Sequence, residues 1–218
     1  MLYLLGIKKR RGTLIYLGVH KGLSLLKIFF KYEKCYGFEA NPEIFNKIPK
    51  IIKLFPGVNI YNKAISNSNG KLKFNISSND GASSSLSKFD KNWNNSSIQM
   101  IKTIDVEAIK LSEFLEKNKI FDVDDYVSDL QGYDLLVLTT LEHLIVQKKI
   151  KTITCETLKT NKQKIYGQAP DNSFEGFDKL LSKNYNCIAS GWSNLKEGVF
   201  EETPANWNEI DCKWVLKK

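Results

Sequence analysis

The sequence predicts one α/β domain built around a doubly wound, mostly parallel sheet. Apolar runs of strand length alternate along the chain with segments of helical pattern, and several runs end in glycine or a polar residue. A length of 218 residues suits a single domain with a substantial core, so residues 1–218 are expected to form one domain. The lead before the first strand is short, and we expect either a missing flank or excision from a larger protein.

Three strands and two helices are expected in the first part of the chain. Gly18 ends the first apolar run, and residues 23–30 follow Gly22 with helical length. Asn41 and Pro42 predict the start of the second helix, because asparagine suits the cap and proline the first turn. The expected strands of this part are residues 13–17, 35–38 and 58–65.

The alternation of expected strands and helices is interrupted after residue 70. Residues 71–76 alternate polar and apolar side chains, which is typical of an exposed antiparallel strand, and residues 75–87 are polar and rich in serine. We therefore interpret residues 70–97 as an insertion with one strand and a long loop, and loops of this length are usually functional or disordered. A strand at 98–106 and a helix at 112–118 are expected next.

Regular alternation of strands and helices resumes after the insertion. Residues 134–147 predict a helix, because Leu135, Leu138, Leu141 and Ile145 fall on one face. The other expected elements are strands at 126–130, 150–155, 185–189 and 210–216 and a helix at 174–183.

The net charge and the hydropathy of the sequence indicate which classes of partner to expect. The formal net charge is +8, but Arg10 and Arg11 are the only arginines among 32 basic residues, and guanidinium groups are favoured for phosphate and guanine recognition. The lysines are scattered with no sustained basic run after Arg11, so a nucleic-acid partner is disfavoured. No uncharged apolar run reaches the length of a membrane span, and none is expected.

Cysteine and histidine usage argues against a structural zinc site. The two histidines are His20 and His143, and no pair of cysteines forms a CxxC motif. The apolar start precedes the first basic residues, which is the reverse of a secretory signal, so a cytoplasmic chain with reduced thiols is expected. The cysteines are Cys35, Cys155, Cys187 and Cys212.

Glycine or polar residues stand where four of the expected strands end. In doubly wound sheets, ligands bind at the carboxyl ends of the strands. Four such endings along one α/β chain therefore predict a ligand site. The residues are Gly18 with His20 and Gly22, Glu39 with Asn41, Asp129 with Gln131 and Gly132, and Glu156.

The spacing of the first two endings indicates the ligand. Glu39 lies 21 residues beyond Gly18, and an acid at about this distance is the usual partner of an adenosine ribose. The turn has Gly18 and Gly22 but lacks the third glycine of a pyrophosphate-binding loop. This pattern favours S-adenosylmethionine over a dinucleotide, although two glycines can also simply end a strand and begin a helix.

Five blocks of the sequence resemble the FkbM-type methyltransferases, in the order of that family. They span roughly residues 13–190, and the order of the blocks is more specific than any one of them. The blocks are LGVHKG at 17–22 with GFEANP at 37–42, NKAIS at 62–66 with NG at 69–70, GASSS at 81–85, SDLQGYD at 128–134, and CET at 155–157.

The resemblance implies a Rossmann-like class I methyltransferase fold. Its mostly parallel sheet would have seven strands, the last one antiparallel, with helices on both faces and a small insertion. It also implies O-methylation of a sugar, a glycan or a similar small polar acceptor, with S-adenosylmethionine as methyl donor. The candidate cofactor-binding residues are Gly18, His20, Lys21, Gly22, Glu39, Asn41, Ala64, Ser83, Ser84, Asp129 and Gln131.

Roles within this set follow the family blocks. Gly18, His20 and Gly22 would line the methionine part of the cofactor, Glu39 would hold the ribose hydroxyls, and Ala64 would lie near adenine. Ser83 to Ser85 would reach the cofactor or the acceptor, and Asp129 would face the methyl group. One departure is Tyr16, which stands where the family usually has an acid, and it puts part of the cofactor affinity in question.

The candidate catalytic residues are Asp129, Glu156 and His20. A sugar hydroxyl is a poor nucleophile when protonated, so a base or a metal is useful. Asp129 is the first candidate base, and its alternative role is a strand-end carboxylate that binds the cofactor. Asp129 and Glu156 could also share a divalent cation, Mg²⁺ or Mn²⁺, through oxygen ligands. Trp192 could stack on a sugar.

Three other functions stay open at this point. An RNA hydroxyl is an alternative acceptor, motivated only by the net charge. A Rossmann-type protein that binds a dinucleotide or nucleotide sugar is a second alternative, and a cofactor-binding module without activity is a third. A segment at 166–174 is expected to be a lid over the acceptor site.

Overall fold

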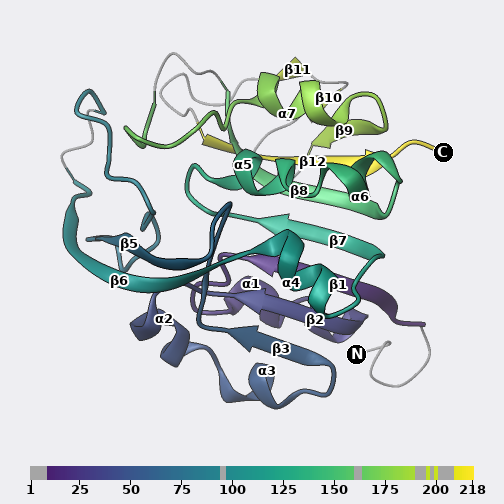
Figure 1. Ribbon diagram of the computed structural model, residues 1–218, viewed down its shortest axis with the longest axis horizontal. Helices are drawn as coiled ribbons and strands as arrows, with labels where there is room; N and C mark the ends of the chain where they lie inside the picture. The colour runs from purple at the N-terminus through teal and green to yellow at the C-terminus, as the bar shows by residue number, and fades with distance from the viewer. Residues whose placement is uncertain (1–8, 94–96, 160–163, 190–194, 197–198, 201–208) are drawn as a thin grey trace.

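A computed structural model describes residues 9–93, 97–159, 164–189, 195–196, 199–200 and 209–218 (Figure 1). Within these residues seven strands form one sheet, and the strand β12 is antiparallel to both its neighbours while the other neighbouring pairs are parallel. The expected seven-stranded sheet with an antiparallel last strand is therefore confirmed. In sheet order the strands are β3 (Val58–Tyr61), β2 (Tyr32–Phe38), β1 (Arg11–Leu17), β7 (Val123–Ser128), β8 (Ile150–Leu158), β12 (Glu209–Leu216) and β9 (Tyr185–Ala189).

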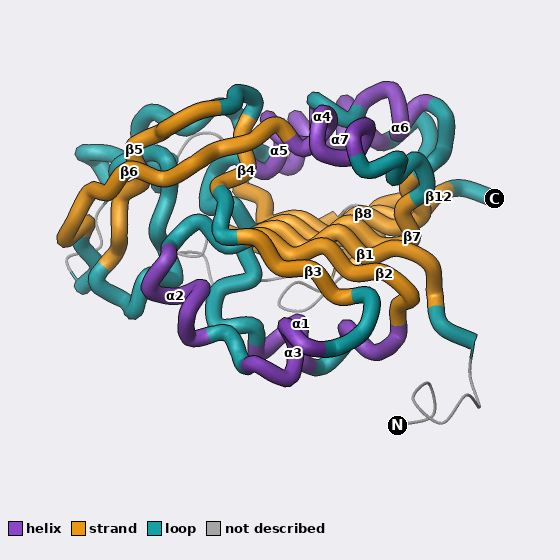
Figure 2. Tube along the Cα trace, turned by 60° about the horizontal axis from the view of Figure 1, so that its bottom comes forward, coloured by secondary structure: helices purple, strands orange, loops and turns teal. Residues whose placement is uncertain are grey.

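Helices cover both faces of this sheet, as Figure 2 shows. On the lower face in that view lie α1 (Leu23–Leu26), the 3-10 turn η1 (Phe29–Lys31), α2 (Pro42–Lys47) and α3 (Lys50–Leu54). On the upper face lie α4 (Leu111–Lys117), α5 (Asp134–Thr139), α6 (Glu142–Val146) and α7 (Phe174–Leu181). No helix in the described part of the chain has the length and apolar character needed to cross a membrane.

Two hydrophobic cores fill the spaces between the sheet and the helices. Leu25, Phe29 and Ile52 pack against the lower face, and the larger core lies on the upper face under α4 to α7. Trp214 belongs to the larger core, where its ring stacks on Phe177 with the centroids 5.2 Å apart. Trp192, which was expected to stack on a sugar, lies outside the described residues.

The second helix begins as its sequence predicts. The Asn41 side chain accepts a hydrogen bond from the Glu43 N–H at 3.0 Å, and Pro42 occupies the first helical position. The expected helix at 23–30 is shorter, because it ends as α1 at Leu26 and the chain continues into the turn η1.

The expected strand at 58–65 is wrong, because the chain leaves the main sheet in its middle. The Asn62 side chain donates to the carbonyls of Glu39 and Ala40 at 2.8 and 3.1 Å, which turns the backbone away after β3. The chain then enters a second sheet in the order β4-β6-β5. Its strands are β4 (Ala64–Ser66), β5 (Gly70–Ser77) and β6 (Met100–Lys110), so this sheet extends beyond residues 70–97 on both sides.

Two further boundaries differ from expectation. The predicted helix 134–147 is split into α5 and α6, where the Thr139 and Thr140 hydroxyls donate back to the carbonyls of Leu135 and Val137. Strand β8 continues to Leu158 because β12 pairs along its whole end, so Glu156 lies within the strand and not at its terminus. A short hairpin of β10 (Leu195–Lys196) and β11 (Val199–Phe200) completes the described elements.

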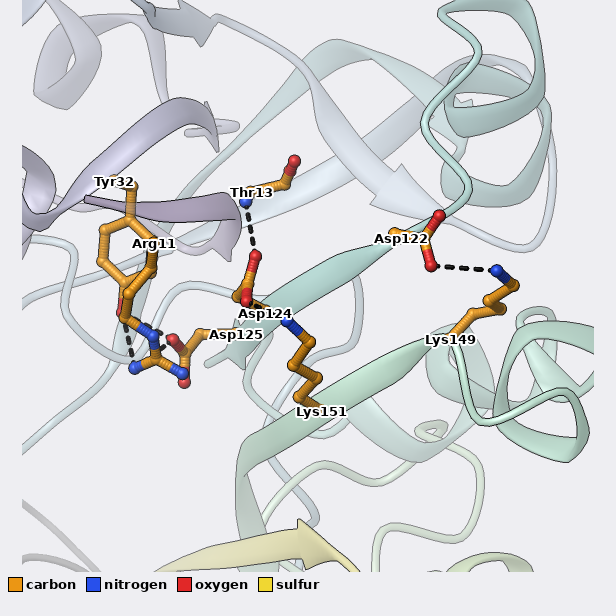
Figure 3. A network of polar contacts seen from close by, with 8 residues as sticks. All are labelled: Arg11, Thr13, Tyr32, Asp122, Asp124, Asp125, Lys149 and Lys151. Carbon is orange, nitrogen blue, oxygen red and sulfur yellow. Dashed lines mark hydrogen bonds and ion pairs between the residues drawn. The ribbon is translucent and has the colours of Figure 1, made fainter. Parts of the chain in front are cut away.

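The amino-terminal edge of the sheet is held by a network of buried and half-buried charges (Figure 3). The carboxylate of Asp125 on β7 accepts a hydrogen bond from the Tyr32 hydroxyl at 2.7 Å and forms an ion pair with Arg11 at 2.6 Å. Asp124 accepts from the Thr13 N–H and from Lys151. These contacts join β2, β1, β7 and β8 at the edge opposite to the one where polar residues were expected to form a site.

Candidate functional site

The carboxyl ends of β1, β2 and β7 meet at one edge of the sheet. The Gly18 N–H donates to the carbonyl of Phe38 at 3.0 Å, and the Asp129 N–H donates to the carbonyl of Leu17 at 3.1 Å. These bonds extend the parallel ladder by one residue beyond each strand. Gly18, Glu39 and Asp129 consequently lie beside one another.

A tight turn follows β1, and its first glycine is required by the close approach of another strand end. Gly18 has a φ of 75°, and a Cβ at this position would lie 2.0 Å from the carbonyl oxygen of Asp129. His20 also has a positive φ, of 51°. Gly22 has a φ of 76° and lies against Ile52 of α3, so it shapes the helix packing below the turn.

Glu39 is a buried carboxylate that organises the turn. Its two oxygens accept the backbone N–H groups of His20 at 2.7 Å and of Asn41 at 2.8 Å. Burial raises the pKa of Glu39, and these two N–H donors oppose the rise. Each carboxylate oxygen keeps further acceptor capacity, which suits a ligand that donates hydroxyl groups.

A pocket with about 590 Å³ of empty space opens above these strand ends. Its wall combines the polar strand-end residues with apolar side chains from β2, β5 and the chain around β4, as is usual for small-molecule sites. The lining residues are Gly18, His20, Phe38, Glu39, Ala40, Lys63, Ala64, Ile65, Phe74, Gly81, Ala82, Ser84, Leu86, Asp129, Leu130 and Gln131.

A serine-rich loop, residues 77–87, crosses this pocket and is held on two sides. On one side the Ser85 hydroxyl donates to the carbonyl of Gln131 at 2.8 Å. On the other side Asp80 forms an ion pair with Lys21, and its carbonyl oxygen lies 3.1 Å from Nε2 of His20. We call this segment the serine loop.

Two carboxyl groups are joined by one amide at the far end of the pocket. Nε2 of Gln131 donates to Oδ1 of Asp129 at 2.5 Å and to Oε2 of Glu156 at 2.9 Å. The amide oxygen of Gln131 accepts a hydrogen bond from the hydroxyl of Tyr166. Gln131 is therefore fixed in place and holds the two acids at a defined separation.

The protein environment distinguishes these two acids. Burial and the negative charge of Asp129 raise the pKa of Glu156 well above its usual range. Burial also raises the pKa of Asp129, to about 6, while the hydrogen bond from Gln131 opposes the rise. Within the pair, Glu156 is thus the acid that holds its proton more strongly, and Asp129 is the acid that ionises first.

A second hollow, with about 340 Å³ of empty space, lies on the other side of this pair. Tyr166 and Asn172 form one wall, and Asn172 is anchored by donating to the carbonyl of Glu156 at 3.1 Å. The segment expected as a lid, 166–174, therefore lines this hollow. Its lining residues are Gly132, Glu156, Leu158, Lys164, Tyr166, Ala169, Pro170, Asn172 and Glu209.

The sequence matches the family described as Methyltransferase FkbM domain over residues 17–187. The chain belongs to the FkbM methyltransferase family. The match confirms the resemblance of the five sequence blocks to this methyltransferase family. Among curated proteins, no match to the sequence was found.

Solved structures support the fold. The FkbM methyltransferase of Methylobacillus flagellatus KT superposes with a TM-score of 0.52 at 11% identity, over 94% of this chain and 43% of that one. The N-methyltransferase NodS of Bradyrhizobium japonicum WM9 superposes with a TM-score of 0.47 at 8% identity, over 99% and 91%. The Methylobacillus likeness confirms the Rossmann-like fold alone, and this chain spans less than half of that protein's length.

The residues of this pocket fit S-adenosylmethionine in their chemistry. Gly18 lines the pocket without a side chain, and Glu39 offers carboxylate oxygens beside it. Phe38, Ile65 and Phe74 supply an apolar wall of the kind an adenine ring requires. Lys63, Phe74 and Leu86 were not singled out from the sequence, and the one available signal was the apolar position of Phe74 in an alternating strand.

The structure brings most of the expected site residues to this one pocket. Four of the expected cofactor-binding residues lie elsewhere: Lys21 pairs with Asp80 on the outer side of the serine loop, Gly22 lies against α3, Asn41 caps α2, and Ser83 binds Asn79 within the loop. Glu156 lines the second hollow. The expected residues that line the pocket are Gly18, His20, Glu39, Ala64, Ser84, Asp129 and Gln131.

The expected divalent cation does not fit this arrangement. An N–H group of Gln131 points at both Asp129 and Glu156, whereas a cation requires oxygen lone pairs directed at one point. In the described ranges no group of three or more His, Cys, Asp or Glu side chains is placed to hold a metal ion. We therefore assign no catalytic role to a metal ion.

Tyr16, at the position where the family usually has an acid, lies half-buried on β1. Burial, together with the charge of Asp129, raises the pKa of Tyr16 to about 12, and a hydrogen bond with Ser24 opposes the rise. Tyr16 is accordingly neutral at physiological pH. Its side chain packs against the lower core, and it is not one of the residues that line the pocket.

Proposed function

We propose that this domain transfers a methyl group from S-adenosylmethionine to a hydroxyl of a sugar, a glycan or a similar small polar acceptor. The observation that carries this proposal is the position of Asp129. It lines the cofactor pocket, and Gln131 joins it to Glu156 in the wall of the second hollow. An ionised carboxylate thus lines the cofactor pocket, and one amide joins it to the acid that lines the second hollow.

The cofactor supplies a methyl group already activated by a sulfonium. The protein's part is to hold the acceptor in line and to remove its proton. In this proposal the acceptor occupies the second hollow, where Asn172 and Glu156 offer hydrogen-bond partners to hydroxyl groups. Asp129, with a pKa of about 6, accepts the hydroxyl proton as the new carbon–oxygen bond forms.

The test of the cofactor is calorimetric titration with S-adenosylmethionine, S-adenosylhomocysteine and NAD. The proposal is supported if S-adenosylmethionine and S-adenosylhomocysteine bind and NAD does not, because the pocket lacks a pyrophosphate loop. Absence of binding by the first two would overturn it and favour a different nucleotide ligand.

The test of the base is Asp129→Asn in an assay that follows tritiated methyl transfer to a panel of monosaccharides and nucleotide sugars. We expect turnover to fall by about 10² to 10⁴ while the dissociation constant of S-adenosylmethionine stays nearly constant. Lost cofactor binding with residual turnover would instead make Asp129 a cofactor ligand. Equal activity with and without a chelator is expected.

A further inference from the structure

The positive charge of the chain is concentrated in one segment. Residues 8–57 contain 11 of the 32 basic residues and three of the 24 acidic residues. The net charge of this segment, +8, therefore equals that of the whole chain, and the remaining residues are balanced at 21 basic and 21 acidic. In the fold this segment supplies β1, β2 and the entire helical layer on the lower face of the sheet (Figure 2).

The same helical layer exposes large apolar side chains. Leu23 on α1 is 62% exposed, and Ile51 and Leu54 on α3 are 61% and 77% exposed. The two helices are in contact, because the Gly22 backbone lies against Ile52 and the ring of Phe29 packs on Phe55 at 4.7 Å. Leu23, Ile51 and Leu54 therefore project from one continuous layer.

Lysines lie beside these apolar side chains in the same helical layer. Lys27 lies one helical turn after Leu23, and Lys50 lies one turn before Leu54, so each shares a helix face with an exposed leucine. Lys27, Lys31 and Lys50 form no ion pair with any residue that the structure describes. We name the surface made by Leu23, Ile51, Leu54 and these three lysines the basic apolar face.

We propose that the basic apolar face docks on an anionic lipid surface. Lysine-rich surfaces are attracted to acidic headgroups, and exposed leucine and isoleucine enter the boundary between headgroups and acyl chains. A nucleic acid would use the charges but leave the three apolar side chains in water. The combination of both features on one layer favours lipid.

Docking would place the cofactor pocket close to the lipid surface. Lys47 of α2, on the same helical layer, pairs with Asp80 of the serine loop at 3.5 Å. The basic apolar face therefore adjoins the rim of the pocket. The proposal does not depend on the identity of the acceptor.

The experiment is co-sedimentation of the full chain with vesicles of phosphatidylcholine alone or with about one third phosphatidylglycerol. We expect binding only to the anionic vesicles, with strong weakening by salt. Lys27→Gln combined with Lys50→Gln should lower the partition coefficient about fivefold for each lysine, and so about 25-fold together. The charge-matched control is Lys71→Gln combined with Lys117→Gln, on β5 and α4, which should bind as the parent does.

A second pair of variants tests the apolar contribution. Leu23→Ser combined with Leu54→Ser should weaken binding at high salt, whereas Ile101→Ser combined with Val146→Ser, at equally exposed positions elsewhere, should not. Circular dichroism melting confirms that each variant is folded. Absence of binding to anionic vesicles, equal losses in the control variants, or binding to an RNA homopolymer in place of vesicles would each overturn the proposal.

Discussion

Gly18 is the residue on which the geometry of the pocket depends most directly. Its positive φ and its contact with the backbone of Asp129 bring the ends of β1 and β7 together. Glu39 then fixes the turn through two backbone N–H groups, and Gln131 fixes the acids at the other end. Each of these residues acts through a short, directional contact, so small substitutions there should have measurable effects.

Gly18→Ala should both destabilise the protein and abolish cofactor binding. The added Cβ would clash with the Asp129 carbonyl and would also strain a backbone with φ of 75°. We expect a loss of about 2 kcal/mol or more in the free energy of unfolding, measured in urea. Gly70→Ala is the matched control, because Gly70 has a φ of 116° but open space around it, and about 1 kcal/mol is expected there.

The serine loop and the charge network at the amino-terminal edge of the sheet each connect several elements of the fold. The loop is tied to the turn after β1 by Asp80, and β2, β1 and β7 are tied at the opposite edge by Asp125. The first tie involves half-buried and exposed side chains and the second a buried carboxylate. We therefore expect the contacts of Asp80 to affect the rate of ligand release and the contacts of Asp125 to affect the free energy of unfolding.

Asp80→Asn should speed release of S-adenosylmethionine with little change in stability. The substitution removes the ion pairs with Lys21 and Lys47, which are of the exposed kind worth at most about 1 kcal/mol. Stopped-flow displacement should show up to about a fivefold faster dissociation at low salt. Asp105→Asn, which removes the pair with Lys73 on the β5–β6 hairpin, is the control and should leave the rate unchanged.

Tyr32→Phe should destabilise the fold without altering cofactor affinity. It removes the 2.7 Å hydrogen bond to the buried Asp125 carboxylate, at the edge of the sheet away from the pocket. We expect a loss of about 1 to 2 kcal/mol in urea unfolding. Asp122→Asn, which breaks an exposed pair with Lys149, should cost less than about 1 kcal/mol. Equal losses would contradict a special role for the buried network.

At the scale of the whole molecule, charge is distributed unequally between two regions. Positive charge lies on the helical layer of the lower face, and buried acids gather around the second hollow. Burial and the charge of Asp129 raise the pKa of Glu209 to about 7, and burial raises the pKa of Asp134 to about 7 as well. These acids bind protons more tightly in the folded than in the unfolded state, so they reduce stability as pH rises from about 4 to 7.

Glu209→Gln should therefore stabilise the protein at high pH. At pH 8 the carboxylate is ionised in both states and its burial is unfavourable, so the variant should gain about 1 to 3 kcal/mol in urea unfolding. The gain should fall as pH is lowered through 7 and vanish near pH 4, where the carboxyl is protonated in both states. Glu116→Gln, on the exposed side of α4, is the control. A gain that does not vary with pH would contradict this account.

The α/β architecture and the position of the ligand site follow from local features of the sequence. Apolar runs, glycine turns and capping residues depend on near neighbours, and they correctly indicate the mostly parallel α/β sheet, the α2 cap and the meeting of Gly18, Glu39 and Asp129. The strand at 58–65 failed because Asn62 bonds to carbonyls more than 20 residues away. No local pattern reports such a contact.

The fold class, the family and the strand ends that form the pocket can be predicted from residue patterns along the chain. Packing in three dimensions establishes which acids share an amide, that Glu156 faces a second hollow, and that the Tyr166 hydroxyl donates to Gln131. It also decided that lysines scattered along residues 8–57 meet exposed leucines on one layer. The physical reason is that these relations depend on distances between segments far apart in the chain, which packing fixes and local periodicity does not.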